Sequence, residues 1–569
     1  MSDVKDLAPT AQPDAPPAPA PSESTPPDAP GPEASAGGVV AVREPAAAAP
    51  APATAVAPAG PSGPFFGPQW PGPGGEAPQP VLLAALVAGV VAAAALPWDG
   101  VGVGWFVTAL AAALAIAGTV AAFRPQARPT SNSDIIVRLA WGVATLALMA
   151  VGGIRAAGWL FALCLPTAVV TGALAVAGGR TLRGLFLGVM AVPIATIRAL
   201  PWGWRTTNTV RGRAQGNTMR TAAAAAVGLV LLFIFGALLA GADAAFAKLV
   251  DGILPAVNAG AVVRWVFSFL VVGLGTLAAC FLALAPPSFD SDEPSRRRTL
   301  RRIEWALPVG ALVLLFTAFV AIQATVLFGG KDYVLRTANL TAADYAREGF
   351  GQLVAVTILT LAVLAIAARF ASRETVEDRI WLRAMLGALS AMTLVIVASA
   401  LSRMWAYEQA YGFTEQRLLV SVFEIWLGVV FVLVLVAGIR LRARATWLPT
   451  AILGAAVLAL LGLAALNPDR YIADRNVDRF ARTGWIDLYY LENLSADAVP
   501  ALNRLPEGYR VCVLHEYDEE LDDAAAREEW RHWNLGRAQA RWALADYVYP
   551  YENRLGPNGC TTLDWDTNP

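Results

Sequence analysis

The sequence predicts an all-α, polytopic membrane protein: a bundle of about eleven transmembrane helices, a disordered N-terminal tail, and a small, mainly helical C-terminal domain beyond the membrane. Three observations predict this fold class. The 569 residues are 56% hydrophobic and only 15% charged, with a mean hydropathy of +0.51, whereas soluble domains carry about 25% charged residues. Apolar stretches close to the ~20 residues that cross a bilayer recur between residues 81 and 466. Basic and acidic residues number 2 and 8 in 1–80, 30 and 17 in 81–466, and 11 and 19 in 467–569.

Residues 1–80 are expected to form a disordered cytoplasmic tail. They hold 21 of the 39 prolines, mixed with Ala, Gly, Ser and acidic residues. A segment of this composition cannot bury enough apolar surface to offset the entropy of ordering its backbone. The tail does not resemble a signal peptide, because it lacks a basic start followed by an apolar run.

Residues 81–466 are expected to form the transmembrane domain. Each span must be helical, because lipid offers no hydrogen-bond partner to backbone N–H and C=O groups. The predicted spans are 81–96, 101–123, 135–154, 156–179, 221–240, 261–285, 305–328, 350–370, 382–402, 418–439 and 447–466. A further apolar run, 185–200, is interrupted by Pro193 and Arg198 and flanked by arginines on both sides. We expect this run to lie at the interface, or to enter the bilayer only shallowly.

The distribution of Lys and Arg predicts the orientation of the bundle. With the tail inside, the cytoplasmic connections contain 22 basic residues and the outer connections contain 8. Basic connections stay on the cytoplasmic side, and the number of predicted spans is odd. The sequence therefore predicts a multi-pass protein of the inner (plasma) membrane, with a cytoplasmic N-terminus and an extracytoplasmic C-terminal domain.

The C-terminal domain, residues 467–569, is expected to be mainly helical and to pack on the outer membrane face. Helices are predicted at 470–482, at 498–505 with Asp497 as the N-cap, and at 522–546. The acidic residues that precede residue 522 are expected to form a solvated turn.

The four cysteines divide into two pairs. Cys164 and Cys280 fall inside predicted spans and are expected to be buried apolar groups. Cys512 and Cys560 fall in the exported region, where a disulfide between them would persist. Two unpaired thiols remain an alternative for the second pair.

The sequence offers no recognisable catalytic or cofactor site. It contains no phosphate-binding Gly-rich loop and no Ser/His/Asp set, and both histidines, His515 and His532, lie in the C-terminal region. The cluster of acids near Cys512 and His515 fits neither a tetrahedral zinc pattern nor a calcium loop. We therefore predict no catalytic residues, no metal, no cofactor and no nucleic-acid partner.

Five short stretches between residues 220 and 540 carry a resemblance to a known family. They are 241–246 (GADAAF), 345–350 (YAREGF), 403–417 (RMWAYEQAYGFTEQR), 467–469 (NPD) continuing to Asn476, and 530–537 (WRHWNLGR). Together they resemble a bacterial membrane family described as domain of unknown function 4173, and its relative 4153. The resemblance implies a multi-pass membrane protein and supplies no established activity. Phe413 departs from the aliphatic residue expected at its position.

All five stretches fall on the predicted outer side or at outer helix ends, where they could form one surface together with the C-terminal domain. Its members would be Asp243, Arg347, Glu348, Arg403, Tyr407, Tyr411, Glu415 and Arg417. One interpretation is a salt-bridged clamp that holds the outer loops and the C-terminal domain together. The other is a binding site for an anionic or polyhydroxylated (glycan) envelope ligand, since Arg offers a bidentate fork and Tyr a stacking face.

Glu424 lies inside the apolar run 418–439, where an ionised carboxylate is costly unless it is paired. Arg264, Arg403 or a proton could neutralise it, and Gln323 is another polar group within a span. Groups of this kind are typical of proton- or ion-coupled transporters, although these usually carry several such groups near the midplane.

The sequence favours a non-catalytic cell-envelope scaffold, sensor or binding protein in the lipid bilayer, with its functional surface on the extracytoplasmic side. A proton- or ion-coupled transporter that uses Glu424 is the first alternative. An envelope-facing glycosyltransferase-like enzyme is a weaker one, because Asp99 in the first outer loop has no neighbouring acid. No oligomeric state is predicted.

Overall fold

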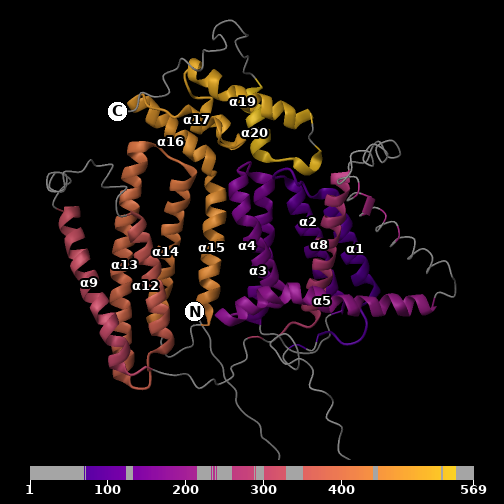
Figure 1. Cartoon of the computed structure of the whole chain (residues 1–569), viewed down its shortest axis with the longest axis horizontal. Helices are drawn as coiled ribbons and strands as arrows, with labels where there is room; N and C mark the ends of the chain where they lie inside the picture. Colours follow the sequence, from indigo (N-terminus) through magenta and orange to yellow (C-terminus); the bar gives the residue numbers. More distant parts are fainter. Residues whose placement is uncertain are drawn as a thin grey trace, which may run out of the picture. The chain divides into compact units, whose positions relative to one another are not determined.

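Helices account for the architecture of the computed structural model (Figure 1). It describes residues 70, 72–123, 132–213, 259–287, 289, 300–328, 350–439, 446–526 and 529–545, with five isolated residues between 228 and 239. Within these ranges there is no β-strand, and the single isolated bridge joins Leu300 to Ala371. The predicted all-α fold class is confirmed.

Ten of the described helices are long and apolar enough to cross a membrane. They include α2 (Val103–Phe123), α3 (Asn132–Ile154), α4 (Gly158–Ala177), α5 (Leu182–Arg213), α8 (Ala259–Leu284), α9 (Arg302–Phe328), α12 (Phe350–Phe370), α13 (Val376–Tyr411), α14 (Glu415–Ile439) and α15 (Trp447–Leu466). The chain is a multi-pass integral membrane protein. Nine of the predicted spans have a counterpart in this set. The predicted span 81–96 corresponds to α1 (Gln79–Ala95), which is shorter at 17 residues, and 221–240 lies almost entirely outside the described residues.

Helix α5 contains the apolar run 185–200, which is predicted to lie at the interface or to enter the bilayer only shallowly. The helix is continuous through Pro193 and Pro201. Its length and composition would allow it to cross a membrane. In Figure 1, however, α5 lies crosswise to the upright helices α3, α4 and α8, with which it shares one end of the bundle. This arrangement favours the interfacial interpretation over a spanning one.

The sequence just before α1 is more ordered than predicted. Trp70, assigned above to the disordered tail, is fully buried, and its indole N–H donates to the carbonyl of Ala285 at 3.0 Å. The guanidinium of Arg198 lies 4.3 Å from the centroid of the Trp70 ring. The bundle therefore begins about ten residues earlier than the predicted boundary at residue 80, and residues 1–69 lie outside the described residues.

The described part of the C-terminal domain contains several short helices. They are α16 (Pro468–Thr483), α17 (Leu488–Glu492), η1 (Ala496–Ala498), α18 (Val499–Leu502), α19 (Glu507–Ala526), η2 (Trp530–His532) and α20 (Leu535–Leu544). The predicted helix 470–482 corresponds to α16. The predicted single helix 522–546 is wrong, because α19 ends at Ala526 and the Asn534 side chain starts a new helix by accepting the Arg537 N–H at 3.2 Å. The predicted acidic turn is also wrong, since those residues continue α19.

The C-terminal domain shares its hydrophobic core with the bundle. One cluster of buried side chains joins Leu148 of α3 and Leu160 of α4 to Ile472 of α16, Leu502 of α18 and Tyr517 of α19. For the side chains of the C-terminal domain, such burial contributes about 1.5–3 kcal/mol each relative to exposure in water. The C-terminal domain therefore packs directly against one end of the bundle.

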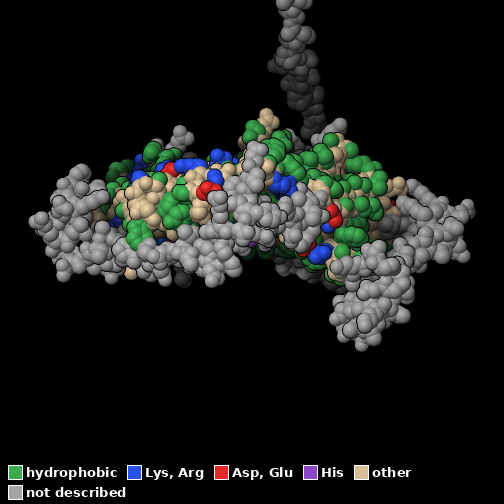
Figure 2. Space-filling model, turned by 90° about the horizontal axis from the view of Figure 1, so that it is seen from above, with side chains coloured by type: hydrophobic (Ala, Val, Ile, Leu, Met, Phe, Trp, Pro, Cys, Tyr) green, Lys and Arg blue, Asp and Glu red, His purple; other side chains and the backbone are tan. Residues whose placement is uncertain are grey.

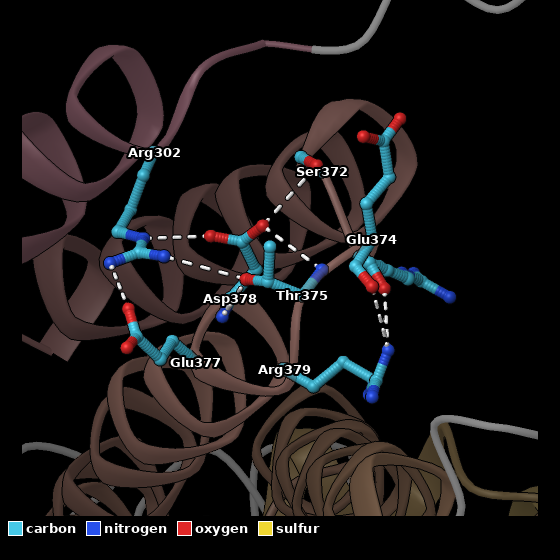
Figure 3. A network of polar contacts seen from close by, with 8 residues as sticks. Arg302, Ser372, Glu374, Thr375, Glu377, Asp378 and Arg379 are labelled. Carbon is cyan, nitrogen blue, oxygen red and sulfur yellow. Dashed lines mark hydrogen bonds and ion pairs between the residues drawn. The ribbon is translucent and has the colours of Figure 1, made fainter.

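At the start of α13, the end farther from the C-terminal domain, a polar network joins α9 to the turn between α12 and α13 (Figure 3). Arg302 of α9 donates to Asp378 at 2.7 Å and to Glu377 at 3.0 Å. Asp378 also completes a capping box with Thr375 at the start of α13. The network fixes the end of α9 against α13, in a region whose hydrophobic core is separate from the one shared with the C-terminal domain.

Candidate functional site

The C-terminal domain binds the turns between bundle helices through polar side chains. Three turns are involved: α1–α2, α3–α4 and α13–α14. We call the side chains that make these contacts the docking residues: Asp469, Asn476, Tyr490, Asp497, Asn534 and Arg537. Figure 2 views the molecule from the top of Figure 1, and the exposed basic and acidic side chains visible there are interspersed with hydrophobic ones.

The α3–α4 turn is held by Asp497 and Asn534. The Asp497 carboxylate, 2% exposed, accepts the backbone N–H of Ala156 at 2.6 Å and that of Ala157 at 3.4 Å. The Asn534 amide is fully buried and donates to the carbonyls of Gly152 and Arg155, each at 2.8 Å. These backbone groups flank the end of α3 and the start of α4, where helices leave donors and acceptors without internal partners.

Asp497 therefore acts differently from its prediction. It was expected to cap its own helix, but its carboxylate binds the turn before α4 instead. Burial raises the pKa of Asp497 above its ordinary value, and the N–H of Ala156 partly offsets this increase. The carboxylate is thus desolvated and held by backbone donors of a distant turn.

The stretch 530–537 fits closely against the bundle. Asn534 binds the α3–α4 turn, and Arg537 donates to the carbonyl of Val101 at 2.9 Å in the α1–α2 turn. The carbonyl of Trp533 accepts the N–H of Val103 at 2.9 Å. A β-carbon at Gly536 would overlap the Asp497 carboxylate, so only glycine allows the approach. Several residues of 530–537, one of the stretches that resemble the family, therefore join the C-terminal domain to the bundle.

The α13–α14 turn is held in a similar way by Asn476. Its side chain accepts the Phe413 N–H at 2.9 Å and donates to the Phe413 carbonyl at 2.8 Å. Gly412 adopts a φ of +85°, and a β-carbon there would lie 2.7 Å from the Asn476 side-chain oxygen. The Phe413 ring is buried against Tyr471, with ring centroids 6.0 Å apart, which gives its departure from an aliphatic residue a packing role.

Tyr490 provides a second contact to the same turn. Its hydroxyl oxygen accepts the backbone N–H of Glu415 at 2.7 Å. Burial is the main cause that raises the pKa of Tyr490 above its ordinary value, so the hydroxyl stays protonated. The turn is therefore bound at Phe413 and at Glu415 by two different helices of the C-terminal domain.

The predicted outer surface is partly assembled. Arg417 lies 4.5 Å from the centroid of the Tyr407 ring and donates to the carbonyls of Tyr411 and Gly412. The rings of Tyr407 and Tyr411 are 4.8 Å apart. Among the described contacts Arg417 does not pair with Glu415, so these two residues do not form the predicted clamp with each other. Arg403 is half-buried on α13, while Asp243, Arg347 and Glu348 lie outside the described residues.

Glu415 instead lines a polar pocket of about 270 Å³ between the bundle and the C-terminal domain. Asp469, Trp159 and Arg537 line it as well. The Asp469 carboxylate is fully buried and accepts the Trp159 indole N–H and the Ser495 backbone N–H, both at 3.1 Å. Two carboxylates against one guanidinium suit a hydroxyl-rich ligand better than an anionic one.

Glu424 is fully buried in α14, and neither of its carboxyl oxygens has a hydrogen-bond partner. Arg264, one of its predicted partners, forms an ion pair with Asp99 at 3.3 Å instead. One turn above Glu424, the Ser421 hydroxyl donates at 3.5 Å to Glu408, a buried acid on α13 that sequence reasoning did not single out. Two buried carboxyl groups therefore lie on the facing helices α13 and α14.

The cysteines occur both in the spanning helices and in the C-terminal domain. Cys164 and Cys280 are free and buried, as predicted. Cys512 is disulfide-bonded, while Cys560 lies outside the described residues, so the pairing of these two stays a prediction. Within the described ranges, no group of three or more His, Cys, Asp or Glu side chains could hold a metal ion.

Comparison with known proteins identifies a family, but the description of that family assigns no activity. The family model described as "Domain of unknown function (DUF4153)" matches residues 140–505, which is more than half of the chain. The related family 4173, which the five stretches also resemble, is not confirmed. No curated protein and no solved structure matches the chain.

Proposed function

Because the chain belongs to the DUF4153 family, whose description assigns no activity, we propose a function from its contacts: a non-catalytic cell-envelope scaffold whose C-terminal domain locks the helix ends on one side of the membrane. The observation that carries the proposal is the binding of Asp497 and Asn534 to the α3–α4 turn. Both side chains are almost completely buried, and both bind backbone rather than a cavity. Groups used in this way stabilise an assembly and leave no reactive atom exposed.

A second feature provides the proposed scaffold with a binding site for a ligand. The pocket lined by Glu415, Asp469 and Arg537 lies at the junction of bundle and C-terminal domain. A polyhydroxylated envelope ligand seated there would contact both parts at once. Occupancy would therefore be coupled to how tightly the C-terminal domain is docked, which is the property a sensor requires.

A transporter is the second candidate, and the buried carboxyl of Glu424 favours it. An ionisable group without a partner inside a spanning helix is costly, and such groups commonly mark ion or proton pathways. Glu408 on the facing helix would supply a second carboxyl toward the end that carries the C-terminal domain.

The two candidates predict opposite results when variants of the chain are expressed in a host strain that lacks the native protein. If the chain is a scaffold, Asn534→Ala at normal membrane levels should leave the envelope sensitive to detergent and osmotic stress, while Glu424→Gln should restore resistance. The reverse pattern would identify transport as the function. Membrane levels of both variants, measured by immunoblot, serve as the control for expression.

The proposal includes the orientation predicted from the basic residues, with the C-terminal domain outside the cell, and this orientation determines which sites are accessible in intact cells. A cysteine introduced as Tyr489→Cys, at a side chain 69% exposed in the C-terminal domain, should react with a membrane-impermeant maleimide. A cysteine introduced as Arg183→Cys, at an exposed position on α5, should react only after permeabilisation. Background labelling should be low because Cys164 and Cys280 are buried. Protection of the Tyr489 position in intact cells would reverse the orientation.

A further inference from the structure

A second pocket lies at the helix ends farthest from the C-terminal domain. It encloses about 340 Å³ between the start of α3, the residues after α4 and the start of α15. Its lining residues are Val137, Arg180, Thr446, Trp447, Thr450 and Ala451. The other ends of α3 and α15 contact the C-terminal domain, so this pocket lies on the opposite side of the bundle from the docking residues.

The surroundings of the pocket are those of a lipid-facing groove. Both α3 and α15 are long and apolar enough to cross a membrane. On α3, Ile136 and Leu139, within two residues of the pocket residue Val137, are each 65% exposed, which suits contact with acyl chains. Trp447 at the start of α15 is 41% exposed, and tryptophan is enriched where hydrocarbon meets headgroups.

Arg180 supplies the charged element of the groove. Its side chain is 38% exposed and forms an ion pair with Asp134 at 2.6 Å. It also donates to the Ser133 hydroxyl at 2.8 Å, which fixes the guanidinium near the start of α3. A guanidinium held beside an apolar groove between spanning helices matches a phosphate headgroup above an acyl chain.

We propose that this pocket binds an anionic phospholipid, with the phosphate at Arg180 and part of one acyl chain against Val137, Trp447 and Ala451. The Asp134 carboxylate offsets part of the positive charge of Arg180. It therefore sets the affinity, and its removal should strengthen binding. The lipid would fill the space between α3 and α15 and so join these helices at the end opposite the C-terminal domain.

The test uses the full-length protein, delipidated in detergent, and follows its melting temperature as phosphatidylglycerol or phosphatidylcholine is added. Phosphatidylglycerol should stabilise the protein more strongly, and Arg180→Gln should weaken its apparent affinity about fivefold. Asp134→Asn should increase the affinity by a similar factor. Arg183→Gln removes an exposed arginine that does not line the pocket, and should leave the response unchanged.

Ala451→Leu provides an independent arm, since it keeps Arg180 and its partners but fills the apolar part of the pocket. It should weaken the response to phosphatidylglycerol even if Arg180→Gln proves too unstable to purify. Equal stabilisation by phosphatidylcholine would overturn the anionic part of the proposal. Equal stabilisation by glycerol phosphate, which lacks acyl chains, would identify a free phosphate ligand and overturn the lipid.

Discussion

Asn534→Ala should lower the free energy of unfolding by about 3 kcal/mol. The change removes two hydrogen bonds to the carbonyls of Gly152 and Arg155 and leaves both acceptors at a buried junction. It also removes the side chain that caps α20. The melting temperature of the full chain in detergent, and the rate at which protease cleaves the C-terminal domain, would both report the loss.

Two further variants separate the docking contribution from general effects. Asn493→Ala removes a side chain whose hydrogen bond to Tyr489 lies on the surface, and should change stability by less than about 0.5 kcal/mol. Asn534→Asp keeps an acceptor for the Arg537 N–H but cannot donate to the carbonyls of the α3–α4 turn. If the aspartate variant were as stable as the native chain, the two bonds from Asn534 to the α3–α4 turn would contribute nothing to stability.

The fold was predictable to the extent that it depends on local composition. Long apolar runs must become helices in lipid, whatever their neighbours. The errors occurred where local signals compete. Asn534 is a good N-cap residue within a run of helix formers, and the run predicted a single helix. In the structure α19 ends at Ala526 and Asn534 caps a separate helix, α20. Pro193 interrupts the apolar run but not the helix, because α5 continues through it, as helices in membranes often do.

The docking contacts could not be predicted, because they join residues that are very far apart in the chain. Asp497 and Ala156 are separated by 341 positions, and no local pattern relates them. The only available signal was the resemblance in 467–476 and 530–537. It singled out Asn476, Asn534 and Arg537 without indicating what they bind. The salt-bridge interpretation of Glu415 and Arg417 relied on opposite charges being close in sequence. In the structure Arg417 binds a ring and carbonyl groups instead.

Glu424→Leu should raise the free energy of unfolding by about 2–3 kcal/mol, which is the opposite of the usual effect of a core substitution. The carboxyl of Glu424 is fully buried in α14, and neither oxygen has a partner, so the native side chain carries a desolvation cost without a compensating bond. Leucine removes that cost and has a similar volume. The melting temperature in detergent measures the change.

Gln323→Leu is the matched control, because the Gln323 side chain already accepts a hydrogen bond from Ser399 at 3.4 Å, so its loss should bring no comparable gain. A carboxyl group whose removal raises the free energy of unfolding does not contribute to the stability of the fold. If Glu424→Leu melts higher, the carboxyl does not stabilise the fold, and proton flux in proteoliposomes decides its role: flux that is present in the native protein and lost in the variant would support the transporter, and no flux in either would support the scaffold. If the variant melts lower, the carboxyl has a stabilising partner such as a bound cation or an ordered water. Glu424 would then be a structural residue, and the transporter would lose the observation that favours it.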